Sequence, residues 1–179
     1  NSCLDKVFCC NSGTEATEGA VKLARRLRAS QAPMPHLSKG MPPEERLRIF
    51  VQTIVRRMVG IERASWQSQL MMREMLRPTK ACQAMVEEYL RPEFEVLLDI
   101  LRELLPENTP RHDLYRTGFS IIGQCLFYRV AGDVVRFLVP PDEFQDEYDV
   151  EHLTDHICRM TLGGLTGFET ERATCRHAY

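Results

Sequence analysis

From residue 43 onward, apolar residues recur at helical spacing, and this pattern restricts the fold more than any other feature of the sequence. In residues 43–60 they match the i, i+3, i+4, i+7 positions of one helix face at every step, and Pro43 stands at the first helical position, which proline favours. Residues 82–105 maintain a second such face. Pro92 lies within it and predicts a kink, because proline has no N–H to bond the carbonyl of Glu88.

Three further helices follow from the same periodicity. We expect them at about residues 62–76, 111–138 and 150–167. The middle of the second, residues 118–128, is apolar nearly all round, which is typical of a helix that is buried on more than one side. The acidic segment 139–149, which contains two prolines, is predicted to be a loop. The predicted fold is therefore all-α, with about five main helices.

The start and the end of the chain lack this pattern. Residues 1–28 predict a short appendix, made of a strand at 5–10, a turn and a helix capped by Thr14. Residues 29–42 hold three prolines and predict a linker. The helical domain is placed at 43–169, and we expect the tail, 170–179, to be frayed.

Composition and charge exclude several classes of protein. Hydrophobic residues make up 44% of the chain and charged residues 27%, with a net charge of −2, so the chain is neither disordered nor polybasic. The seven cysteines show no zinc-binding spacing and are interpreted as reduced, mostly buried thiols. We see no signal peptide and no membrane span, and we expect a cytoplasmic protein. No arrangement of residues indicates catalysis.

The segment from Leu4 to Arg25, which contains Asn-Ser-Gly-Thr-Glu-Ala, resembles class III pyridoxal-phosphate aminotransferases. The resemblance covers about residues 3–26 and implies that Ser12, Gly13 and Thr14 would cradle the phosphate of the cofactor at a helix N-terminus. The alternative is an orphan helix cap. No later segment resembles the Schiff-base lysine region of that family, so we expect no bound cofactor. A fragment of such an enzyme, inactive without its lysine-bearing region, is the alternative function.

A longer stretch, about residues 41–167, is similar to the C-terminal domain of TetR-family transcriptional regulators of the CecR-like subgroup. The resemblance rests on residues 43–50, 72–79, 86–94 and 120–128. It implies a domain that senses a small molecule and dimerises, and not an enzyme. The helix-turn-helix domain that precedes this region in the family is not found in residues 1–40, so we expect DNA binding only through a domain missing from this chain. The two resemblances together suggest a chimeric sequence.

A pocket for a small apolar or aromatic effector is predicted between the helices. Aromatic and methionine side chains suit adaptable apolar sites, although ordinary core packing is the alternative for most of them. The predicted pocket residues are Trp66, Met71, Met75, Phe94, Phe119 and Ile122.

A homodimer is predicted through the last two helices, which pair in this way in the family. Their glycines allow close approach of a partner, and the all-round apolar middle of the earlier helix leaves one face for the core and one for a partner. The predicted interface residues are Phe119, Gly123, Phe127, His156, Met160, Gly163 and Gly164. His152 and His156 are spaced for a metal, but no third ligand can be named, and we predict no metal site.

Overall fold

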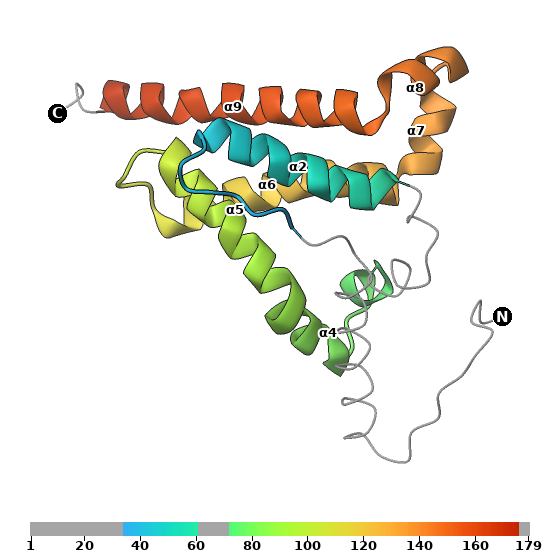
Figure 1. Cartoon of the computed structure of the whole chain (residues 1–179), viewed down its shortest axis with the longest axis horizontal. Helices are drawn as coiled ribbons and strands as arrows, with labels where there is room; N and C mark the ends of the chain where they lie inside the picture. The colour runs from blue at the N-terminus through green and yellow to red at the C-terminus, as the bar shows by residue number, and fades with distance from the viewer. Residues whose placement is uncertain (1–33, 61–71, 176–179) are drawn as a thin grey trace.

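The computed structural model describes residues 34–60 and 72–175, and over these residues the chain is helical with no strand (Figure 1). The predicted all-α fold is therefore confirmed for this part of the chain. The appendix, with its expected strand at 5–10, lies outside the described residues. The labelled elements are α2 (Pro43–Val59), α4 (Lys80–Met85), the π-helical η2 (Val86–Leu90), α5 (Arg91–Leu104), α6 (Arg111–Val130), α7 (Gly132–Leu138), α8 (Pro141–Glu147) and α9 (Val150–Cys175).

Helix α2 lies at the centre of the bundle. It packs against α9 on one side and against α5 and α6 on the other (Figure 1). Its apolar face is fully buried, as Leu47 and Val51 show, and it meets Leu97 and Leu101 of α5 in the same core. Burial of each such side chain contributes about 1.5–3 kcal/mol. The spacing that predicted α2 from the sequence is therefore the spacing of its core contacts.

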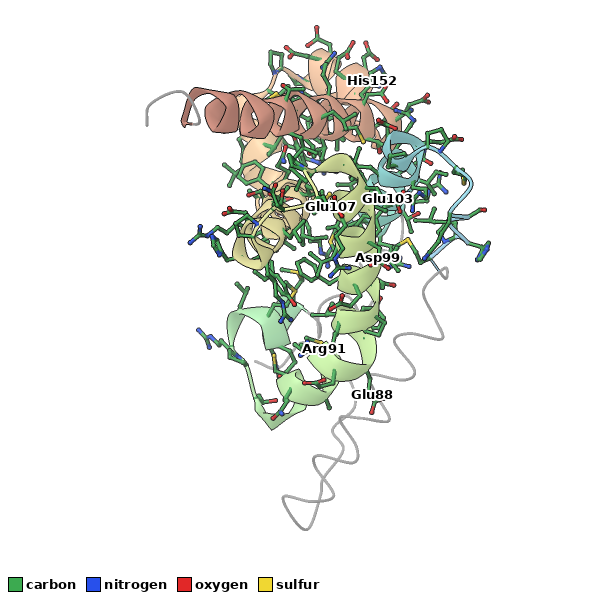
Figure 2. All side chains as sticks on the ribbon, turned by 90° about the vertical axis from the view of Figure 1, so that its left-hand side faces the viewer. Glu88, Arg91, Asp99, Glu103, Glu107 and His152 are labelled. Carbon is green, nitrogen blue, oxygen red and sulfur yellow. The ribbon has the colours of Figure 1, made fainter. Side chains whose placement is uncertain are left out.

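Ion pairs join α2 to its neighbours. Arg57 Nη1 donates hydrogen bonds to both carboxylate oxygens of Glu93 on α5, at 2.9 and 2.8 Å. The nearly buried Arg46 pairs with Glu103, which Figure 2 places toward the end of α5 opposite Arg91. These pairs set how α5 lies along α2.

The helix contains a π-helical segment just before Pro92, which the sequence pattern did not predict. The turn before it widens into the π-helical segment η2, and the N–H of Arg91 bonds the carbonyl of Val86, five residues earlier. Pro92 then lies in the first turn of α5, a position that proline tolerates. The helical pattern 82–105 is thus divided among α4, η2 and α5.

The predicted helix 111–138 is two helices. At Ala131 the backbone leaves the helical region, with φ −104° and ψ 13°, and α7 begins at Gly132. The periodicity of the side chains continues across this break, so the sequence pattern did not reveal it.

The prediction of a loop at 139–149 was wrong for its central part. Pro141 opens α8 at a favoured position, and Asp142 and Glu143 occupy its first turn, where the helix dipole stabilises negative charge. Helix α9 also continues to Cys175, beyond the expected end at Gly167 and into the segment expected to be frayed. Within the described residues, no helix is long and apolar enough to cross a membrane.

Candidate functional site

An aromatic cluster joins α5 to α6. The ring of Phe94 stacks on Phe119 with a centroid distance of 5.0 Å, and Tyr115 contacts both rings at 5.6 and 6.1 Å. Gly118 lies beneath Phe94, and a Cβ at this position would come within 2.9 Å of two of its ring carbons. The glycine therefore allows the ring of Phe94 to lie directly on the backbone of α6.

Two of the predicted pocket residues, Phe94 and Phe119, thus lie together. Ile122, one turn further along α6, is half-buried and packs against the core. Met75 lies in the helical segment 72–76 with 38% of its surface exposed. Trp66 and Met71 fall outside the described residues. The pocket as a whole remains a prediction.

The seven predicted interface residues are all exposed on α6 and α9. Phe119, Phe127 and Met160 each expose more than half of their surface. At Gly123, Gly163 and Gly164 an added Cβ would meet no other atom within 4 Å. The opposite faces of the same two helices are in the core, through residues such as Ile121, Cys125, Leu153 and Ile157. Each of the two helices therefore exposes apolar side chains and bare glycine backbone on the side away from the core.

Further apolar side chains, which were not predicted from the sequence, are exposed at the end of α6 and on α7. Phe137 is 89% exposed and Leu138 is 76% exposed, and Val130 and Val134 are also exposed. Val134, Phe137 and Leu138 have helical spacing, so the sequence did indicate that they share one helix face. This face was not recognised as exposed, because residues 111–138 were predicted to form a single helix.

A cavity of about 280 Å³ lies where α6, α7, α8 and α9 meet, at the end of the bundle where α7 and α8 appear in Figure 1. It contains none of the predicted pocket residues. Phe144 and Tyr148 stack at 5.3 Å on one wall, and Tyr128 contacts Tyr148 at 6.5 Å. The lining residues are Val59, Tyr128, Gly132, Val135, Arg136, Phe144, Tyr148, Asp149, Val150 and Leu153. They come from five elements, which no local sequence pattern brings together.

Asp149 caps the start of α9 beside this cavity. Its Oδ1 accepts hydrogen bonds from the backbone N–H groups of Glu151 and His152 at 2.8 Å, and it lies 3.0 Å from His152 Nδ1. The bond from the backbone N–H of His152 lowers the pKa of Asp149, and the side-chain bond to Asp149 raises the pKa of His152. His152 lies on the outer side of α9 (Figure 2). Among the described residues, no three potential ligands are grouped to hold a metal.

Two cysteines are buried between α6 and α9. Burial raises the pKa of the Cys125 thiol to about 12, and burial also raises the pKa of Cys158. Both thiols are therefore protonated at neutral pH and are poor nucleophiles. This agrees with the interpretation of the cysteines as reduced core residues. Cys3, Cys9 and Cys10 lie outside the described residues.

Comparison with known protein families identifies the fold. Residues 43–165 match the family model of the C-terminal domain of the HTH-type transcriptional dual regulator CecR, a TetR-like domain. A search of curated proteins finds no match. The aminotransferase resemblance of residues 3–26 lies outside the matched range and has no support from the comparisons, and Ser12, Gly13 and Thr14 lie outside the described residues. Because the match extends over more than half of the chain, the protein belongs to the CecR C-terminal domain family of TetR-like regulatory domains.

Proposed function

We propose that this protein is a domain that senses a small molecule and forms a homodimer for a TetR-family transcriptional regulator. The single observation that carries the proposal is the open face of α6 and α9. It combines exposed Phe119, Phe127 and Met160 with glycines at which the backbone is uncovered. A large apolar surface of this kind is unfavourable in water unless a partner covers it.

A second copy of the chain suits this face best. The face is formed by two adjacent helices, and a two-fold axis through it would pair the same residues with themselves in a four-helix arrangement. The bare backbone at Gly163 and Gly164 would let the partner's helix approach closely. The dimer would act on DNA only through a helix-turn-helix domain, which residues 43–165 do not comprise.

Phe119 connects the two proposed activities. It stacks on Phe94 in the predicted effector pocket, and it also belongs to the proposed dimer face. A small apolar or aromatic effector that displaces Phe94 would therefore move a side chain of the interface. An effector that binds one arrangement of the dimer more tightly than another shifts the population toward that arrangement.

The dimer is tested by Met160→Glu. This residue is 58% exposed, so the substitution leaves the core of the monomer intact but places a charge at the centre of the proposed interface. We expect light scattering to show a dimer for the natural chain and a monomer for the variant. Leu76→Glu, at a position that is 68% exposed and lies outside the face, is the matched control and should remain dimeric. A natural chain that is monomeric at micromolar concentration contradicts the proposal.

The effector pocket is tested by fluorescence, because Trp66 is the single tryptophan of the chain. A neutral aromatic probe such as 1-naphthol should quench or shift the emission of Trp66 in a saturable way. Phe94→Ala should weaken this response, whereas Phe144→Ala, which changes the separate cavity beside α8, should not. An equal loss in both variants would remove the assignment of the pocket to the Phe94 cluster.

A further inference from the structure

The cavity at the corner of α6, α7, α8 and α9 has one cationic side chain in its lining, Arg136. The guanidinium of Arg136 lies over the ring of Phe144 at 5.3 Å. Unlike Arg46 and Arg57, it is not paired with a carboxylate among the described residues. Arg136 is exposed, and its hydrogen-bond donors are therefore available to a ligand, while the cation–π contact favours a position beside Phe144.

Asp149, the acidic side chain in the lining, already has hydrogen-bond partners within the protein. Asp149 Oδ1 accepts two backbone N–H bonds from α9 and contacts the imidazole of His152, whose raised pKa favours a positive charge beside it. The carboxylate is thus compensated within the protein. Of the two charged groups at the cavity, Arg136 is the one that lacks a counter-ion.

The rest of the wall is aromatic or aliphatic. Phe144 and Tyr148 form a stacked pair, Tyr128 stands across from Tyr148 at 68°, and Val135 and Leu153 contribute methyl groups. The volume of about 280 Å³ compares with about 150 Å³ for an apolar cavity that holds benzene. A ligand with one or two fused rings therefore fits the space.

We propose that this cavity binds an aromatic monocarboxylate. The ring system would lie against Phe144, Tyr148 and Tyr128, and the carboxylate would pair with the guanidinium of Arg136, whose planar fork matches carboxylate geometry. The site goes beyond the proposed function, because its lining includes no residue of the Phe94 cluster and none of the predicted interface residues.

The acidic residues of α8 favour a ligand with a single negative charge over one with several. Helix α8 presents Asp142, Glu143, Asp146 and Glu147, all exposed and none of them in the lining. Because α8 also contributes Phe144 to the lining, these carboxylates add negative charge near the cavity, and a polyanion would be repelled more strongly than a monoanion. A phosphate or a dicarboxylate is therefore disfavoured at this corner.

The proposal is tested with three probes of nearly equal shape on the full chain. Calorimetry compares 2-naphthoate, the neutral 2-naphthamide and the cationic 2-naphthylmethylammonium. We expect 2-naphthoate to bind about tenfold or more tightly than 2-naphthamide, as a charge-assisted hydrogen-bonded pair implies. Arg136→Gln should reduce the affinity for 2-naphthoate to that for 2-naphthamide. Arg116→Gln, which removes an exposed arginine outside the cavity, should not change it.

A second set of variants locates the binding site. Val150→Trp fills the cavity and Phe144→Ala removes one aromatic wall, and each should weaken both 2-naphthoate and 2-naphthamide, with folding checked by circular dichroism. The proposal is overturned if 2-naphthoate binds no more tightly than 2-naphthamide, if the ammonium probe binds best, or if Arg136→Gln has no effect. Measurement on Met160→Glu separates this site from dimerisation, because its binding should persist in a monomer.

Discussion

Gly118 and Phe94 are packed so closely that a Cβ on residue 118 would lie 2.9 Å from two carbons of the aromatic ring. The ring of Phe94 also stacks on the ring of Phe119, the next residue of α6. The contact determines where the ring of Phe94 sits on α6, and through Phe119 it connects the predicted effector pocket to the proposed dimer face.

Gly118→Ala should therefore have opposite effects in two backgrounds. In the natural chain it displaces the ring of Phe94, and we expect a loss of about 1–2 kcal/mol in the free energy of unfolding. In Phe94→Ala the obstacle is absent, and the better helix propensity of alanine should stabilise the chain by about 0.5–1 kcal/mol. Denaturant unfolding of the four proteins gives the coupling. The same sign in both backgrounds would contradict the contact.

Gly123→Gln should separate folding from association. Nothing lies within 4 Å of a Cβ at this position, so the isolated monomer should gain about 0.5–1 kcal/mol from helix propensity. The proposed dimer should weaken, because the added side chain holds the partner's helix away. Sedimentation across a range of concentrations measures the dissociation constant, and Gly123→Ala is a graded control with a smaller effect. A dimer of unchanged strength would remove Gly123 from the interface.

Glu93→Gln should destabilise the contact between α2 and α5. The side chain of Arg57 is 8% exposed and bonds both oxygens of Glu93, so the substitution takes away the negative charge that faces a nearly buried cation. We expect a loss of about 3 kcal/mol in the free energy of unfolding. Combining it with Arg57→Met should recover part of this loss, because the buried charge is then absent as well. Glu87→Gln, in an exposed pair with Arg91, should cost less than about 0.5 kcal/mol.

The Asp149–His152 contact at the start of α9 should lose its stabilising effect both at low pH and at high pH. Asp149 has a lowered pKa, so its contribution is present above the ordinary value of 3.8 and is lost as the pH falls through the lowered pKa. His152 has a raised pKa, so its contribution is present below 6.5 and is lost as the pH rises through the raised pKa. The first turn of α9 should be most protected from amide exchange between these limits.

Asp149→Asn tests this cap directly. An NMR titration should show the pKa of His152 falling toward its ordinary value, because its charged hydrogen-bond partner is gone. Asp142→Asn, which removes a carboxylate of α8 instead, should leave the titration of His152 in place. An unchanged pKa of His152 in Asp149→Asn would show that the contact does not persist in solution.

Local periodicity was sufficient for the helices that have one apolar face. The residues of α2 alternate between core and solvent at the helical repeat, and the prediction matched its observed bounds closely. It failed for α7 and α8, because the break at Ala131 is a change in one backbone position and because Pro141 is equally suited to a loop or to the start of a helix. The same contrast holds for the candidate sites. Helical spacing predicted that Phe127 and Met160 are exposed, but it did not predict the cavity beside Arg136.

The sequence by itself determined that the part of the chain that the structure describes is helical, which face of α2 is buried, and that α6 has more apolar surface than one core contact can cover. These properties depend on the identity and spacing of neighbouring residues. In a helix of 3.6 residues per turn, this spacing determines which residues lie on the same face. Only the tertiary structure decided that Phe94 rests on Gly118 and that Arg136, Phe144 and Tyr148 line a cavity together with Val59. Those contacts join residues that are distant in the sequence. They depend on how whole helices pack against one another, and local periodicity does not specify this packing.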